Sequence, residues 1–250
     1  REKLEEVRDE IVARGGTAYV YPCDLADLDA IETTVQQILG EHAAVDMLVN
    51  NAGRSIRRGV ALSYDRFHDY QRTMQLNYFG AIKMIMCLMP HMKERRFGHV
   101  VNVSSIGAQT NPPRFSAYVA SKAALDAWTR VVSSEVIGDN ITFTTIHMPL
   151  VKTAMIAPTK MYDAFPTITP DEAGDLVCEA LRSKPKTINT RLGTFGEVAY
   201  ALAPKAVDQI LHTAYKVFPD SAAAKGEQDP SEKASVEQIA MANLMKGVHW

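Results

Sequence analysis

The sequence predicts an α/β fold, a doubly wound parallel sheet with helices on both faces. Apolar residues recur at helical spacing in several long segments, and short apolar segments of strand length separate them. Because helices and strands alternate along the chain, the strands are expected to pair in parallel through crossover connections. The 250 residues, 46% of them hydrophobic, are enough for one substantial core.

The first expected elements are a helix over residues 1–14 and a strand over residues 17–24. The helix has an apolar face made of Leu4, Val7, Ile11 and Val12. The pair Gly15-Gly16 ends it, since glycine readily adopts the backbone conformation of a helix C-terminus. The strand segment reads TAYVYPCD.

The same order repeats in the next segment. Residues 27–42 form a second amphipathic helix, and Asp27 is a candidate N-cap because its carboxylate can accept bonds from free backbone N–H groups. Residues 45–53, VDMLVNNAG, form a short apolar strand that runs into a turn.

The middle of the chain continues the alternation. A long helix is expected over residues 65–95, up to and around Pro90, followed by a buried strand over 98–105. A helix over 117–136 and a strand over 141–149 complete the expected sheet.

The composition changes after about residue 219, which predicts a domain boundary. Residues 220–233 are small, polar and proline-containing, as in a linker. Residues 234–250 have the spacing of a short amphipathic helix, interpreted as a C-terminal helical arm for packing or oligomer contact. The main domain is therefore expected over residues 1–219.

Composition argues against several classes of function. The 27 basic and 29 acidic residues give a formal net charge of -2, a field too weak for a nucleic-acid-binding protein. No apolar run approaches the roughly 20 residues of a membrane span, and the first residues are too charged for a signal peptide. Three scattered cysteines without metal-ligand spacing predict reduced thiols, no metal and a cytoplasmic protein.

Polar and small residues follow the expected strands, where doubly wound sheets bind their ligands. They are Asp24, Asn50 to Gly53, Ser104, Ser105 and Pro149. The expected helix over 117–136 adds Tyr118 and Lys122, four positions apart and hence on one face. An ammonium near a phenol stabilises the phenolate and lowers its pKa, which suits proton transfer at a carbonyl or alcohol oxygen.

Three further features can join this pair. A serine at the end of the strand over 98–105 can hydrogen-bond the same substrate oxygen, and the small residues of NNAG let the backbone approach a flat cofactor. Asn77 occupies a helix interior, where asparagine is disfavoured. It either makes a functional hydrogen bond or is a satisfied buried amide.

These motifs resemble those of the short-chain dehydrogenase/reductase family, in order and in spacing, over most of residues 1–219. The matching segments are CDLAD (23–27), NNAG (50–53), LNYFG (76–80), VVNVSS (100–105), YVASK (118–122) and MPLVKT (148–153). The resemblance implies Tyr118 as general acid/base, with Lys122 lowering its pKa and binding the nicotinamide ribose. It implies Ser105, preferred to Ser104, as the group that orients the carbonyl, and Asn77 as the holder of a relay water.

The resemblance also implies a nicotinamide cofactor, NADPH in preference to NADH. Asp24 and Leu25 would flank the adenine. The cofactor would also be lined or held by Asn51, Ala52, Gly53, Tyr118, Lys122, Pro149, Val151 and Thr153. The family's first two strands and its glycine-rich TGxxxGxG turn are absent from this chain, and Leu150 stands where the family often has glycine. Arg1 is a candidate remnant of a segment that selects the 2′-phosphate of NADP.

A narrower resemblance is to the reductase domain of bacterial fatty acyl-CoA reductases. It is carried by the segments starting at Ser104, Phe143 and Arg191. It implies reduction of a fatty acyl-CoA to an aldehyde, with the alcohol as a further product, and a second reductase domain fused upstream. Candidate residues for an apolar acyl trench are Met155, Ile156, Met161 and Phe165. Basic residues of the segment 182–191 could meet CoA phosphates or form a solvated loop.

Two alternatives stay open at this point. One is a reductase or dehydrogenase of another lipophilic alcohol, ketone or 3-oxoacyl substrate. The other is a non-catalytic binding module that retains the fold. The family resemblance further implies a homo-oligomer formed through the two long helices, and a lipophilic substrate is compatible with a protein peripheral to a membrane.

Overall fold

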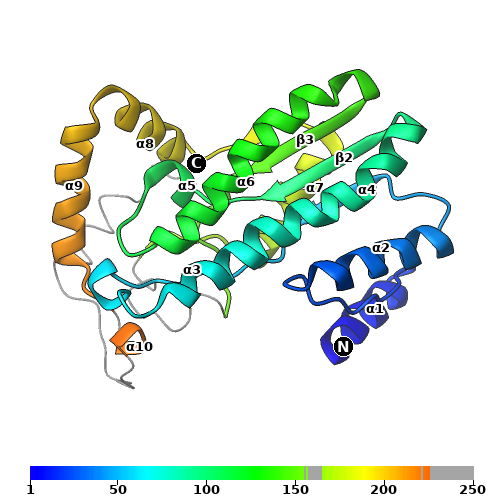
Figure 1. Ribbon diagram of the computed structural model, residues 1–250, viewed down its shortest axis with the longest axis horizontal. Coiled ribbons are helices and arrows are strands. Elements are labelled where there is room, and N and C mark those ends of the chain that lie inside the picture. The colour runs from blue at the N-terminus through cyan, green and yellow to red at the C-terminus, as the bar shows by residue number, and fades with distance from the viewer. Residues whose placement is uncertain (155, 157–164, 221, 226–250) are drawn as a thin grey trace.

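The computed structural model describes residues 1–154, 156, 165–220 and 222–225. Its centre is a four-stranded sheet of order β1-β2-β3-β4, and every neighbouring pair is parallel. The strands are β1 (Met47–Asn50), β2 (Gly98–Val103), β3 (Ile141–Ile146) and β4 (Thr187–Ile188) (Figure 1). The expected α/β class is confirmed. The short β4 lies in the segment that the sequence predicted as a basic loop.

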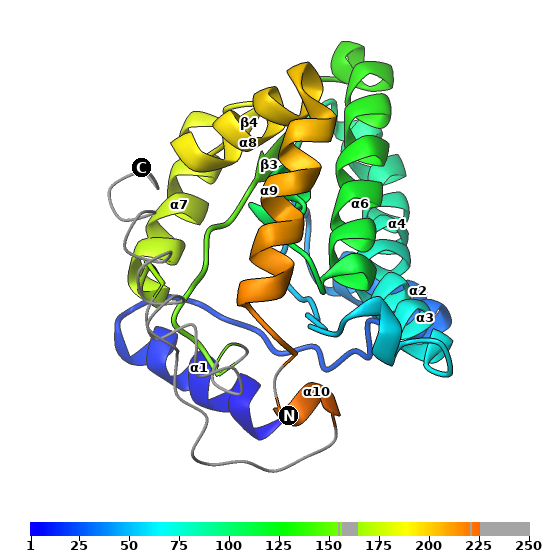
Figure 2. The ribbon, with the colours of Figure 1, turned by 90° about the vertical axis from the view of Figure 1, so that its left-hand side faces the viewer.

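Helices cover both faces of this sheet, as predicted. On one face lie α2 (Leu28–Glu41), α3 (Phe67–Met74), α4 (Ala81–Arg95) and α6 (Ser116–Glu135); on the other lies α7 (Pro170–Ser183) (Figure 2). Side chains of neighbouring β2 residues point to opposite faces of the sheet. Val100 packs with Ile85 in the first core, and Val101 packs with Ala180 of α7 in the second.

The remaining helices lie around this sandwich. They are α1 (Glu2–Ala13), α5 (Gly107–Thr110), α8 (Arg191–Leu202), α9 (Pro204–Val217), α10 (Ala222–Lys225) and the 3₁₀ turns Val60–Leu62 and Ile137–Asp139. The helix α5 directly follows β2 and packs against α8, which packs against α9 (Figure 1). These helices therefore form a wall beside the carboxyl ends of the strands.

The predicted helix boundaries hold closely. Asp27 caps α2, because its carboxylate accepts bonds from the backbone N–H groups of Asp29 and Ala30 at 3.0 and 3.1 Å. The long helix expected over 65–95 is α3 and α4 joined by a π-helical turn, Gln75–Gly80.

The strand predicted over residues 17–24 is not formed. This segment makes no ladder with another strand among the described residues, so its strand-like composition has no hydrogen-bonding partner there. The preceding helix α1 is formed, but its predicted apolar face is exposed, with Val7 at 54%. The pattern predicted the conformation of α1 correctly, but that face is not buried among the described residues.

The segment expected to begin a linker at residue 220 is held against the domain where the structure describes it. The carboxylate of Asp220 accepts a bond from the Gly59 N–H at 2.7 Å and lies 3.1 Å from the Arg114 guanidinium. Arg57 donates to the carbonyl of Pro219 at 2.7 Å. The predicted arm over residues 234–250 lies outside the described residues.

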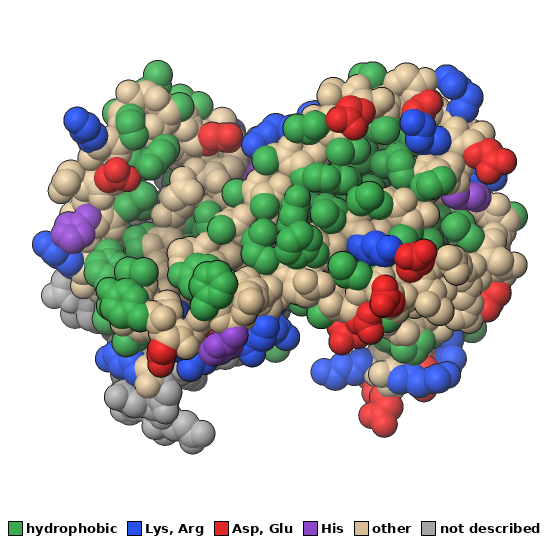
Figure 3. Space-filling view, viewed as in Figure 1, with side chains coloured by type: hydrophobic (Ala, Val, Ile, Leu, Met, Phe, Trp, Pro, Cys, Tyr) green, Lys and Arg blue, Asp and Glu red, His purple; other side chains and the backbone are tan. Residues whose placement is uncertain are grey.

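Figure 3 shows hydrophobic side chains gathered over α4 and α6. Met86 of α4 is 59% exposed and Val131 of α6 is 58% exposed. These are the helices through which copies of the chain are predicted to associate. No helix within the described residues is long and apolar enough to cross a membrane.

Candidate active site

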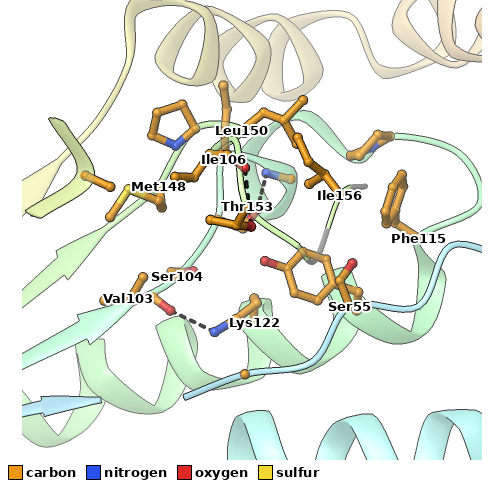
Figure 4. Close-up of a pocket in the computed structure, with 18 of the residues that line it drawn as sticks. Ser55, Val103, Ser104, Ile106, Phe115, Lys122, Met148, Leu150, Thr153 and Ile156 are labelled. Atoms are coloured by element: carbon orange, nitrogen blue, oxygen red, sulfur yellow. Dashed lines mark hydrogen bonds between the residues drawn. The ribbon is translucent and has the colours of Figure 1, made fainter. Parts of the chain in front are cut away.

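The carboxyl ends of β2 and β3 open into a cavity of about 1000 Å³. The predicted residues Ser105, Tyr118 and Lys122 all line it. Figure 4 shows Lys122 at this cavity together with Met148, Leu150 and Phe115. Most of the other lining side chains are also apolar. The cavity thus combines a few polar groups with a large hydrophobic wall, as ligand sites commonly do.

Tyr118 and Lys122 stand one turn apart on α6, so both reach this cavity. The Lys122 ammonium donates to the carbonyl oxygen of Val103 at 2.7 Å (Figure 4). Burial lowers the pKa of Lys122 from 10.5 to about 8, and the negative charge of Asp126 partly opposes this.

The pKa of Tyr118 differs in direction from the sequence prediction. Burial raises it above its usual value of 10, and a hydrogen bond with Ser105 only partly opposes the rise. Lys122 is not among the causes of this shift. The phenol therefore keeps its proton across the neutral range in this structure.

The two serines after β2 have different partners. The Ser104 hydroxyl donates to Asp126 Oδ2 at 2.9 Å, and so its proton points away from the cavity. Ser105 Oγ accepts the N–H of Gly107 at 3.0 Å and hydrogen-bonds Tyr118. This arrangement favours Ser105 over Ser104 as the group that would meet a substrate oxygen.

Asn77 lies in the π-helical turn, a distortion often found at functional sites. Its Oδ1 accepts the N–H of Arg54 at 2.8 Å, and its Nδ2 donates to the Arg54 carbonyl at 2.8 Å and to Ser121 Oγ at 2.9 Å. The side chain is 1% exposed and is not among the residues that line the cavity. In this structure its amide ties the loop after β1 to α6, and its predicted hold on a relay water remains a prediction.

Most of the predicted cofactor residues line the cavity: Asn51, Ala52, Gly53, Tyr118, Lys122, Pro149, Val151 and Thr153. A Cβ at Gly53 would lie 3.4 Å from both Lys122 Nζ and Asn77 Oδ1, so glycine leaves space at the centre of the site. These residues fit a flat cofactor that approaches the backbone closely.

Asp24 and Leu25 are not among the cavity-lining residues. The Asp24 carboxylate accepts the N–H of Ala26 at 2.9 Å. Leu25 packs on the π-helical turn, where its carbonyl oxygen would lie 2.2 Å from a Cβ at Gly80. Their predicted place beside the adenine stays a prediction.

Of the four predicted acyl-trench residues, Ile156 and Phe165 line the cavity. Met155 and Met161 lie outside the described residues. Phe165 also packs on Phe218, with ring centroids 5.5 Å apart. Residues near both ends of the segment 155–165, which contains the four predicted trench residues, therefore line the cavity.

The basic segment 182–191 is spread out in space. The Lys184 ammonium lies 4.6 Å from the centre of the Phe97 ring, next to the amino end of β2, and Lys186 hydrogen-bonds Ser133 of α6. Neither residue lines the cavity. Contact of this segment with CoA phosphates stays a prediction, as does the alternative of a solvated loop. The Arg1 side chain pairs with Glu5 at 2.8 Å.

Sequence reasoning missed a polar group behind the site, formed by the buried Asp126 and His147 and the exposed Asn189. The Asp126 carboxylate accepts from Ser104, as described, and lies 3.1 Å from His147 Nε2. The signal was present, because Asp126 lies four residues after Lys122 on the same helical face and His147 directly follows β3. A carboxylate on the inner face of a buried helix needs a partner, and this requirement points to His147.

Comparison with known proteins identifies the class. Residues 1–162 match the family model described as short chain dehydrogenase, and the chain belongs to this family. A short-chain dehydrogenase from Streptomyces avermitilis has the same fold, with a TM-score of 0.69 over 85% of this chain and 86% of that one at 24% identity. A metagenomic short-chain oxidoreductase in complex with NADP matches with a TM-score of 0.60 at 26% identity, over 71% and 73% of the two chains.

Curated relatives are closer in sequence. The chain is 51% identical over 250 residues to a fatty acyl-CoA reductase of Acinetobacter baylyi, covering all of this chain and 84% of that protein. It is 49% identical over 254 residues to an uncharacterized oxidoreductase of Mycobacterium tuberculosis, of which it covers 74%. A fatty acyl-CoA reductase of the same organism is 41% identical over 84% of this chain and 72% of that protein. The chain is thus an oxidoreductase of the short-chain dehydrogenase family, similar to fatty acyl-CoA reductases.

Proposed function

We propose that this protein reduces a fatty acyl-CoA to a fatty aldehyde with NADPH as the hydride donor. The observation that carries the proposal is the cavity of about 1000 Å³, in which Tyr118 and Ser105 face a largely apolar wall. A long acyl chain needs such a wall, and its carbonyl needs polar groups at one point. The names of the relatives in Acinetobacter baylyi and Mycobacterium tuberculosis support this choice of substrate.

NADPH bound near Gly53, Pro149 and Thr153 would supply the hydride to the thioester carbonyl carbon. The Ser105 hydroxyl would donate a hydrogen bond to the carbonyl oxygen, stabilising the negative charge that develops there. Tyr118 would transfer its proton to the same oxygen, because its phenol is protonated at neutral pH. The resulting hemithioacetal would return its hydroxyl proton to the Tyr118 phenolate as it expels the CoA thiolate, and would so leave the aldehyde without a cysteine nucleophile.

Lys122 would bind the cofactor ribose, since its ammonium lies beside Gly53, where the predicted cofactor residues converge. With a pKa of about 8 it is mainly protonated at neutral pH. Above this pH the ammonium loses its proton, and activity is expected to fall. Preference for NADPH over NADH, a further step to the alcohol and association into oligomers are parts of the same proposal.

The test is NADPH oxidation by the purified protein with palmitoyl-CoA, decanal and a panel of steroids as substrates. Turnover of palmitoyl-CoA to hexadecanal supports the proposal, and turnover of steroids without any thioester reduction contradicts it. Tyr118→Phe is expected to lower kcat by about 10² to 10⁴, the usual contribution of a positioned general acid. Tyr70→Phe is the matched control, because its hydroxyl bonds Ser116 at 2.8 Å and does not line the cavity. Equal losses in both variants would show that Tyr118 is not the acid.

A further inference from the structure

Asp126 carries a carboxylate that is buried behind the cavity and is used by none of the steps above. The residue is 5% exposed. Its Oδ2 accepts from Ser104 Oγ at 2.9 Å and faces His147 Nε2 at 3.1 Å. Its Oδ1 has no hydrogen-bond partner among the described residues. A buried charge held in this way is costly unless it is compensated, so its partners indicate what it does.

The geometry around His147 indicates that the imidazole carries both protons. Nε2 faces the carboxylate of Asp126, and Nδ1 faces Asn189 Oδ1 at 2.6 Å. Only an imidazolium can donate from both nitrogens to two oxygen acceptors. Burial alone would lower the pKa of His147, but the bond to Asp126 and its charge outweigh burial and raise it. Asp126 and His147 therefore form a buried ion pair.

This pair is joined to the site by two parallel contacts from one helix. Lys122 of α6 donates to the carbonyl of Val103, and Asp126, one turn later, accepts from the hydroxyl of Ser104. Val103 and Ser104 are consecutive at the end of β2, directly before Ser105. The two contacts thus fix how α6, with Tyr118, lies relative to the strand that presents Ser105.

We propose that Asp126, paired with His147, is a positioning residue for the reductase site: its carboxylate orients Ser104, and its charge acts on Lys122, which lies one turn earlier on α6. This proposal rests on the proposed reductase function. The carboxylate does not line the cavity, so it acts through its neighbours and not on the substrate.

The charged and titratable groups around Asp126 come from three elements. Lys122 and Tyr118 share α6 with it, and its charge raises the pKa of both. His147 faces it from the end of β3, and Glu197 of α8 adds negative charge near His147. Removing the carboxylate or removing the imidazolium should therefore change the electrostatic field at Lys122 in opposite directions.

The test is the pH profile of kcat/KM for NADPH-dependent reduction of palmitoyl-CoA. In the wild-type protein activity should fall as the pH rises through the pKa of Lys122, near 8. Asp126→Asn should move this fall in activity, the alkaline limb of the profile, to lower pH by about one unit. His147→Gln should move the limb to higher pH, because the charge of the Asp126 carboxylate is then uncompensated. Opposite shifts are a signature that a merely structural role would not produce. If both variants keep the wild-type limb, the proposal is wrong.

A second measurement reads Lys122 without turnover, so it separates this proposal from the proposed function. The free energy of urea unfolding is measured against pH with and without Lys122→Met, in the wild-type and Asp126→Asn backgrounds. The pH at which the Lys122 contribution begins to change should be lower in the Asp126→Asn background. If wild-type protein reduces no thioester but this shift is found, the proposed function fails while the electrostatic link stands. If the shift is absent, the link fails.

Breaking one member of a buried ion pair can prevent folding. The double variant Asp126→Asn/His147→Gln removes both charges and retains an oxygen acceptor for Ser104. It should fold, and its activity limb should lie between those of the two single variants. A limb outside that interval would overturn the assignment of opposite electrostatic effects to the two residues.

Discussion

Lys122 is the residue at which stability and the proposed activity should oppose each other most strongly. Folding lowers its pKa from 10.5 to about 8, chiefly by burial. This shift corresponds to a destabilisation of about 3 kcal/mol at neutral pH, at about 1.4 kcal/mol per pKa unit. Lys122→Met removes this cost but also the bond to Val103, which contributes about 1 to 2 kcal/mol. We therefore expect the variant to be more stable than wild type by about 1 to 2 kcal/mol at pH 7, and inactive.

The sign of this effect should depend on pH. Lysine at this position binds a proton more tightly in the unfolded chain, so the penalty is complete below about pH 8 and vanishes above 10.5. The advantage of Lys122→Met should shrink across this window and reverse at its upper end, where only the lost hydrogen bond remains. Urea unfolding followed by circular dichroism at several pH values measures it.

A matched control is available on α4. The Lys83 ammonium pairs with Glu32, and this bond raises the pKa of Lys83 instead of lowering it. Lys83→Met should therefore lower the free energy of unfolding slightly at pH 7, and never raise it. A Lys122→Met protein that is less stable than wild type at pH 7, with no pH dependence between 8 and 10.5, would refute the reasoning.

Two other substitutions test the packing and the core electrostatics. Gly80→Ala should destabilise the protein by about 1 to 3 kcal/mol, because its Cβ would lie 2.2 Å from the backbone oxygen of Leu25. Gly40→Ala has open space around it and should stabilise α2 by up to about 1 kcal/mol. Thermal melts compare the two variants, and similar melting temperatures would contradict the close approach at Gly80. Burial lowers the pKa of His99, so its contribution to stability is present above the unfolded value of 6.5 and is lost as pH falls below it. The free energy of unfolding should accordingly fall less steeply with decreasing pH for His99→Asn than for wild type, and identical slopes would contradict this.

The parts of the fold that the sequence predicted are those determined by local pattern. The helix over 117–136 and the strand over 98–105 combine clear periodicity with distinct ends, and both are present within a few residues. The four-residue spacing of Tyr118 and Lys122 then places both on one face without any tertiary information. Their convergence with Ser105 follows from the rule that ligands bind at the carboxyl ends of parallel strands.

The parts that could not be predicted depend on what lies next to a residue in space. The segment 17–24 has the composition of a strand, but a strand also requires a neighbouring backbone to bond with, and no residue within the segment specifies that neighbour. The prediction that the pKa of Tyr118 is lowered was wrong for a related reason. Spacing shows that a lysine and the phenol share a helix face, but it does not show that burial sets the direction of the phenol's pKa shift.

The corrected direction of that shift bears on the proposed chemistry. In reduction the phenol must arrive with its proton and give it to the carbonyl oxygen, and a raised pKa keeps the proton in place. Oxidation of an alcohol needs the opposite, a phenolate that can accept a proton. Burial of Tyr118 therefore supplies the protonated phenol that reduction requires at neutral pH, and the Lys122 ammonium, mainly protonated there, lies one turn away on α6.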